Sequence, residues 1–441
     1  MSSNDLTRVD SRWLRYLDGE LASRATESAN QIAETLTEGL SLPATDVSLS
    51  TGRAGESLAL AVLSRALRKP RLLDAARKAW SETRTLLSTL PVGPGLYSGF
   101  TGVAWVHALV GGMIEEVEGG DDVHQEIEST LIAHIRDSRQ RAEYELIGGL
   151  VGMGVYGLER APNGRSLELL QEVTKGIVAL AEVSETGATW LTLPTASSMQ
   201  SVTKARKLPT NWRGYRNLGI AHGIPGCVAL LGRLSGSGLL DAEGTEVLEK
   251  SVKWLLGSRV PHPKGLAYPS WLPYEGELTG DTASKYRVGW CYGDLGVAAA
   301  LCVAGANHRR KEWVSEAAEI AQGCLRVAIE DCGVLDHGLC HGAAGVGHVL
   351  ARIGFASGEQ TLIQGAQDWI QRLFEMRTPD AGIHGYARLR PRNLAAEHPS
   401  EADYYFSSDS GFLMGAAGVA MTLAAACSGD DPEWDRALLV S

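Results

Sequence analysis

GAAGVGHVLARI, residues 342–353, joins a Gly-x-x-Gly motif to an apolar helix, and the chain repeats this combination. Seven copies begin at residues 52, 99, 149, 223, 293, 342 and 415, so the steps between them are 47, 50, 74, 70, 49 and 73 residues. A step of 47–50 residues fits one helical hairpin, and a longer step fits the same hairpin with about 20 to 25 additional residues. The repeat therefore predicts seven similar helical hairpins.

The helix that each motif opens contains small and aliphatic residues on nearly all sides, which is typical of a buried helix. Examples are GVAAALCVAG at 296–305 and GVAMTLAAAC at 418–427. Amphipathic helices with a charged face lie between the motifs, for example at 71–90, 245–259 and 360–377. No comparable series of alternating strands appears. We therefore predict an all-α fold, a closed ring with the apolar helices as inner wall and the amphipathic helices as outer wall.

The three longer steps contain extra residues near 185–217, 260–288 and 378–410, each directly before a Gly-x-x-Gly motif. We expect a single domain over residues 1–441, in which these insertions project over one end of the ring. Loops in that position would shape a substrate groove.

Composition narrows the function classes. The net charge of −11 argues against general affinity for nucleic acid or anionic lipid. No segment reaches 18 uninterrupted apolar residues, so no membrane span is expected, and the N-terminus lacks the apolar core of a signal peptide. The seven cysteines are sparse and odd in number, which favours free thiols in a reducing cytoplasm over a disulfide framework.

Candidate chemistry appears when the repeats are aligned on their first glycine. The position directly before it holds His222 and His341, and the position before that holds Cys291 and Cys340. Equivalent positions of a closed ring converge on one end of its axis, so these side chains should meet. Two thiolates and one imidazole, Cys291, Cys340 and His341, match a zinc site whose fourth position is open, as in catalytic sites. The remaining cysteines are expected to be ordinary core residues.

The neighbours of this cluster leave alternatives open. His222 fits a fourth ligand, an acid or base, or an imidazole bonded to the helix entrance. Arg287, Trp290 and Tyr292 flank Cys291 in YRVGWCYGDLG. Arginine can stabilise a developing oxyanion and tyrosine can donate a hydrogen bond; a surface ion pair and aromatic packing are the structural alternatives.

Three motifs resemble those of a known family. AHGIPG (221–226), GWCYGDLG (289–296) and LCHGAAGVGHVL (339–350) resemble the signatures of the lanthionine synthetase C-like proteins. WCYGDLG is more similar to the bacterial class I lantibiotic (lanthipeptide) cyclases than to the eukaryotic relatives. With the Gly-x-x-Gly pattern, the resemblance covers about residues 45–430.

The resemblance implies a double-layered α/α toroid with a central Zn²⁺ held by Cys291, Cys340 and His341. It implies that His222 is the acid/base and that Arg287, Trp290 and Tyr292 lie near the zinc. One position departs from the family, because YELIGGLVG (144–152) has Glu145 where the family typically has Asp. Glu145 either orients His222 or only pairs locally.

The bacterial members of the family add peptide cysteine thiols to dehydroalanine or dehydrobutyrine and so form (methyl)lanthionine rings. The implied partners are a dehydrated precursor peptide, a lanthipeptide dehydratase and an export transporter. Two alternatives remain: addition of glutathione or another thiol to dehydrated residues, and a non-catalytic zinc-containing scaffold that binds peptides. A glycosidase on an α/α barrel would need paired carboxylates at the ring mouth, where the repeat supplies thiols and imidazoles.

Overall fold

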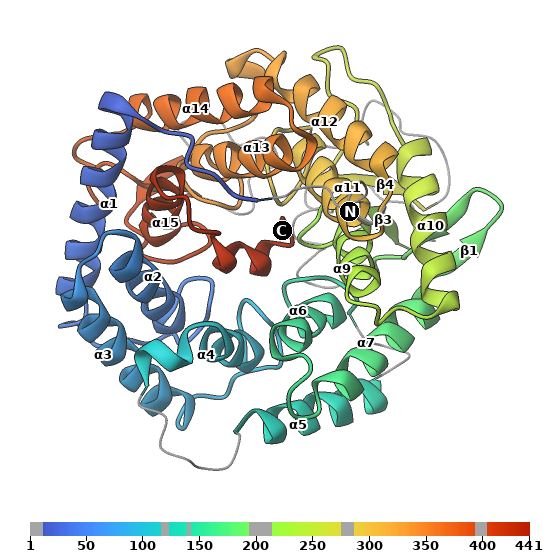
Figure 1. Ribbon diagram of the computed structural model, residues 1–441, viewed down its shortest axis with the longest axis horizontal. Coiled ribbons are helices and arrows are strands. Elements are labelled where there is room, and N and C mark those ends of the chain that lie inside the picture. Colours follow the sequence, from blue (N-terminus) through green and yellow to red (C-terminus); the bar gives the residue numbers. More distant parts are fainter. Residues whose placement is uncertain (1–11, 116–122, 139–142, 194–213, 275–285, 393–403) are drawn as a thin grey trace, which may run out of the picture.

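A computed structural model describes residues 12–115, 123–138, 143–193, 214–274, 286–392 and 404–441. The described helices form two concentric layers around a central axis (Figure 1). The inner layer consists of α2 (Arg53–Ala66), α4 (Phe100–Ile114), α6 (Leu150–Arg160), α9 (Ile224–Gly236), α11 (Asp294–Asn307), α13 (Ala343–Ser357) and α15 (Ala416–Cys427). The outer layer consists of α1 (Gly19–Gly39), α3 (Pro70–Leu87), α5 (Val123–Ser138), α7 (Ser166–Leu180), α10 (Ala242–Gly257), α12 (Lys311–Leu325) and α14 (Gln360–Glu375).

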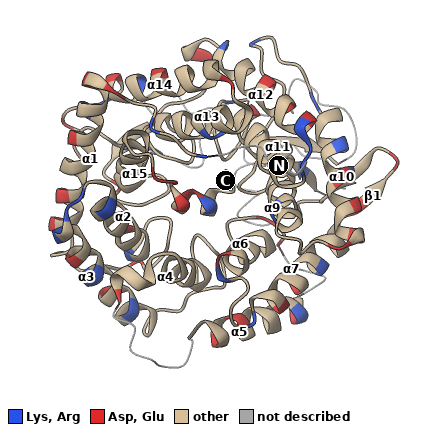
Figure 2. Cartoon of the chain, in the orientation of Figure 1, with Lys and Arg blue, Asp and Glu red and all other residues tan. Residues whose placement is uncertain are grey.

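The inner layer closes on itself. Each inner helix packs on the next along the chain, and α15 packs back on α2. Inner helices are buried almost all round, whereas an outer helix such as α14 buries one face, and charged residues gather on the outer layer (Figure 2). A Cβ on Gly232 of α9 would lie 2.5 Å from the Cα of Ala304 in α11, so the small residues permit the close contact between the two helices. The prediction of an all-α double-layered toroid is confirmed.

The Gly-x-x-Gly motif has a steric origin. Its first glycine is the N-cap of every inner helix. At the second glycine, an added Cβ would lie 1.8–2.5 Å from the carbonyl oxygen of the residue six positions earlier, in all seven repeats. The turn before each helix thus folds back over its first turn, and any side chain at the second glycine would collide with the backbone.

Short strands occur in the described parts of the three longer steps, which the expectation of helices alone missed. They are β1 (Glu182–Ser184), β2 (Gly187–Thr189), β3 (Tyr215–Asn217), β4 (Trp271–Pro273), β5 (Arg388–Pro391) and β6 (Tyr404–Ser407). They pair as three antiparallel two-stranded sheets, β1–β2, β3–β4 and β5–β6. Much of the three expected insertions, residues 194–213, 275–285 and 393–403, lies outside the described residues.

Candidate metal centre and its surroundings

The turns before the inner helices meet at one end of the ring through backbone hydrogen bonds. The bonds join residues two positions before the first glycine of neighbouring repeats. They run from the N–H of Cys291 to the oxygen of Cys340, then Cys340 to Leu413, Leu413 to Ser50, Ser50 to Tyr97 and Tyr97 to Ile147, all at 3.0–3.1 Å. Equivalent positions therefore do converge, as the closed ring predicted.

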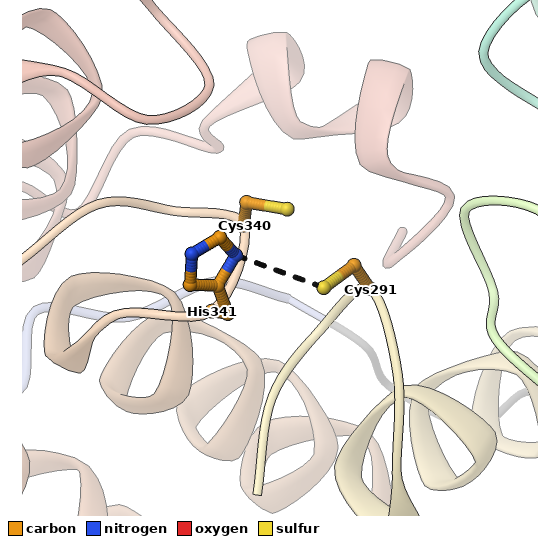
Figure 3. Close-up of side chains that lie close together, drawn as sticks. All are labelled: Cys291, Cys340 and His341. Carbon is orange, nitrogen blue, oxygen red and sulfur yellow. Dashed lines mark hydrogen bonds between the residues drawn. The ribbon is translucent and has the colours of Figure 1, made fainter. Parts of the chain in front are cut away.

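Two thiols and one imidazole come together at this end. The Sγ of Cys291 lies 3.9 Å from the Nδ1 of His341, and Figure 3 shows the sulfur of Cys340 beside the same ring. One ligand atom from each of Cys291, Cys340 and His341 lies within 4.8 Å of the other two. The structure thus assembles one cluster from the turns before α11 and α13.

The carboxylate of Asp336 lies next to the His341 imidazole, on the side away from the thiols. The Oδ2 of Asp336 lies 3.5 Å from the Nε2 of His341, so the ring points its other nitrogen toward the thiols. Burial alone would lower the pKa of His341, but Asp336 and Cys291 outweigh it and raise that pKa to about 10. Asp336 itself is buried, with 3% of its side chain exposed.

The two thiols differ in proton affinity. The pKa of Cys291 falls well below its usual value because Cys340 donates a hydrogen bond to it, with a further contribution from His341. The pKa of Cys340 rises because its proton is held by Cys291. Arg287 favours the thiolate form of both. The cluster therefore carries one thiolate readily, and a second needs additional positive charge.

The geometry and chemistry of the cluster fit a metal ion such as zinc. On a tetrahedral zinc, with Zn–S about 2.3 Å and Zn–N about 2.0–2.1 Å, ligand atoms lie roughly 3.5–3.8 Å apart, close to the spacing seen here. The Oδ1 of Asp336 is buried without a hydrogen-bond partner among the described residues, as expected for a carboxylate that needs positive charge nearby. The ligand atoms of Cys291, Cys340 and His341 can hold such a positive ion, and His341 lies next to Asp336.

His222 pairs with Glu145. The Nδ1 of His222 lies 2.7 Å from the Oε2 of Glu145, whose carboxylate also accepts the backbone N–H groups of Ile147 and Gly148. Burial alone would lower the pKa of His222, but Glu145, with smaller contributions from Cys291 and Glu143, raises it, and the net shift is upward. The extra methylene of glutamate therefore does not prevent the contact, and Glu145 pairs both locally and with His222.

Tyr292 lies beside this pair. Its ring is stacked against His222 with centroids 6.1 Å apart, and its hydroxyl oxygen accepts a hydrogen bond from Asn217 at 3.3 Å. The Oδ1 of Asn217 accepts the N–H of Gly219, which orients the amide. Burial raises the pKa of Tyr292 above its ordinary value, so the phenol keeps a proton that it can donate.

Trp290 lies away from solvent. Its side chain is fully buried and its indole N–H donates to the oxygen of Leu438 at 2.8 Å. Tyr97, at the repeat position equivalent to Cys291, donates its hydroxyl to Ala437. The C-terminal helix η4 (Glu433–Leu438) thereby sits inside the ring (Figure 1). Packing accounts for the burial of Trp290, and a role for it near the proposed zinc stays a prediction.

Sequence reasoning missed Asn217 and Asp336. Both lie six residues before the first glycine of their repeat, the position that holds Arg287 in the repeat between them. The same alignment that revealed the cysteines would have revealed this second set of polar residues.

Comparison with known proteins identifies the family. The family model described as lanthionine synthetase C-like protein matches residues 43–439, nearly the whole chain. The chain belongs to this family. Among solved structures it is similar to one titled nisin cyclase, with 18% identity and a TM-score of 0.72 over 95% of this chain and 98% of that one. This likeness shows the shared fold.

Two further comparisons add little. A structure of an inactive variant of an alpha-1,6-mannanase of Salegentibacter sp. HEL1_6 matches with 11% identity and a TM-score of 0.42, over 91% of this chain and 98% of that one, too weak to support an argument. No curated protein matches the sequence. None of the helices in the described part of the chain is long and apolar enough to cross a membrane.

Proposed function

We propose that the protein is a zinc-dependent lanthipeptide cyclase. It would add cysteine thiols of a dehydrated precursor peptide to dehydroalanine or dehydrobutyrine, forming (methyl)lanthionine thioether rings. The observation that carries the proposal is the Cys291–Cys340–His341 cluster, together with the His222–Glu145 pair, which is close enough for Cys291 to raise the pKa of His222. Membership of the lanthionine synthetase C-like family and the likeness to nisin cyclase support it.

Cys291, Cys340 and His341 are the proposed zinc ligands, and three protein ligands leave a fourth position for a substrate group. A zinc ion held there would lower the pKa of a substrate thiol and so supply the nucleophile at neutral pH.

The remaining steps use side chains of this chain. The thiol sulfur forms a bond to the β-carbon as the carbon–carbon double bond opens, and negative charge develops on the carbonyl oxygen. Arg287, whose charge already acts on both thiols, is the proposed stabiliser of that oxygen, and Tyr292 is a second donor. His222, protonated with the help of Glu145, delivers a proton to the α-carbon. The reaction is balanced, because the peptide is rearranged without gain or loss of atoms.

The setting follows from this chemistry. A dehydratase must supply the dehydrated residues, and an exporter would remove the product, so both are proposed partners. We place the reaction in the cytoplasm, where peptide thiols stay reduced. The three insertions of a single domain would line the groove for the peptide.

The test is a synthetic peptide with one dehydroalanine and one cysteine, treated with the zinc-loaded protein and then with a thiol-alkylating reagent. Ring closure removes the alkylatable thiol without changing the mass of the untreated peptide, so mass spectrometry follows it directly. We expect thiol loss with the wild-type protein and not with Cys340→Ala. With glutathione present, a peptide heavier by one glutathione would instead favour the small-thiol alternative. Binding without thiol loss would favour the scaffold.

A further inference from the structure

Asp336 lies behind the imidazole of His341, on the side away from the two thiols. Its Oδ2 is 3.5 Å from the Nε2 of His341, whose Nδ1 is the nitrogen 3.9 Å from Cys291. We infer that Asp336 is a positioning residue: it orients the His341 ring so that Nδ1, and not Nε2, is the metal ligand. This inference rests on the proposed metal site and deepens it.

The two nitrogens of a neutral imidazole have different roles. One carries a proton and the other has the lone pair that binds a metal, so the partner of the first decides which nitrogen is free. An ionised carboxylate can accept hydrogen bonds but not donate them, so Asp336 beside Nε2 favours the tautomer with its N–H on Nε2. Carboxylate partners of this kind increase the basicity of a metal-bound histidine and restrict its rotation.

Asp336 has few hydrogen-bond donors around it. Its side chain is 3% exposed, and its Oδ1 has no hydrogen-bond partner among the described residues. The backbone N–H of Leu389 in β5 approaches Oδ2 only at 3.4 Å. A buried carboxylate with so few donors is unfavourable unless positive charge lies nearby. The His341 ring, positively charged or bound to a cation, is the neighbour that meets this need.

The repeat supplies a matched control. Asp409 occupies the equivalent position, six residues before Gly415, and is also buried. It accepts the N–H of Gly411 and pairs with Arg388 at 2.9 Å, so its role is structural and touches no proposed ligand. The two aspartates therefore occupy equivalent positions in the fold, but only Asp336 contacts the imidazole of a proposed metal ligand.

The experiment measures zinc affinity by competition with a chelator for wild type, Asp336→Asn, Asp409→Asn and Cys291→Ala, with circular dichroism to confirm folding. We expect Asp336→Asn to weaken zinc binding about 10- to 100-fold and Asp409→Asn to leave it unchanged. Wild-type affinity in Asp336→Asn, or an equal loss in Asp409→Asn, would overturn the inference. Wild-type affinity in Cys291→Ala would instead overturn the metal site itself.

A double-mutant cycle keeps the inference testable if Asp336→Asn also loses stability. In a His341→Ala background, Asp336→Asn should cause no further loss of zinc affinity, because its effect acts through the missing ring. Losses that add independently would show that Asp336 acts by another route and would contradict the assignment.

Discussion

The turns at Gly223, Gly293 and Gly342 carry the candidate chemistry, whereas those at Gly52, Gly99 and Gly415 share their architecture without it. In both groups a glycine caps the inner helix and the second glycine of the motif approaches the preceding turn closely. The side chains differ: for example, the two positions before the first glycine hold Cys340 and His341 at Gly342, and Leu413 and Met414 at Gly415. The ring therefore supplies a common geometry, and substitution at a few equivalent positions supplies the site.

One backbone feature also separates the turns. Gly293, two residues after Cys291, has φ of +99°, while the other six N-cap glycines have φ between −100° and −146°. Only glycine adopts such a φ without strain. The backbone at the start of α11, next to Cys291, therefore differs in conformation from the start of the other inner helices.

Replacing His222 should have the largest effect on activity. If it delivers the proton, His222→Asn should slow ring closure about 10²- to 10⁴-fold, the usual contribution of a positioned acid or base, while zinc content stays unchanged. The matched change in the other group is Ser98→Asn, at the equivalent exposed position before Gly99, which should close rings at the wild-type rate. Thiol alkylation over time gives both rates. Equal rates for His222→Asn and wild type would make another group the proton donor, with Tyr292 the first to test.

A smaller effect is expected at Glu145. Its carboxylate raises the pKa of His222, and His222 must be protonated to act as an acid. Activity should therefore fall as pH rises through that raised pKa. Glu145→Gln should move this falling limb to lower pH and slow turnover about tenfold at neutral pH. The effect is modest because the His222 side chain is 44% exposed, so losing its hydrogen bond to a charged partner costs free energy at the low end of the usual range.

Ser48→Ala is the control, at the repeat position equivalent to Glu145, and should leave the pH profile in place. If Glu145→Gln changes only the melting temperature, the carboxylate serves the local backbone and not His222.

Much of the fold was predictable because the repeat is local. Each Gly-x-x-Gly motif begins a helix at its first glycine, and the small-residue pattern places that helix inside the ring. The strands were not predictable, since pieces of three or four residues such as β3 and β5 show no usable alternation. The packing of Trp290 on Leu438 joins residues 148 apart in sequence, and no pattern near Trp290 indicates it.

The candidate site likewise contains residues that the sequence predicts and residues whose contacts only the structure shows. Cys291, Cys340 and His341 were placed together from the repeat alone, and the structure brings them within reach of one ion. The repeat also aligns Asp336 and Asn217, but only the structure shows which neighbour each of them contacts.

Cys291 and Cys340 are proposed metal ligands, whereas the equivalent residues of the other repeats are not, and elemental analysis of zinc distinguishes them directly. Wild type and Ser50→Ala, at the equivalent position in the first repeat, should each carry about one zinc per chain, and Cys291→Ala and Cys340→Ala should lose most of it. Full zinc content in both cysteine variants would show that Cys291 and Cys340 are not the metal ligands.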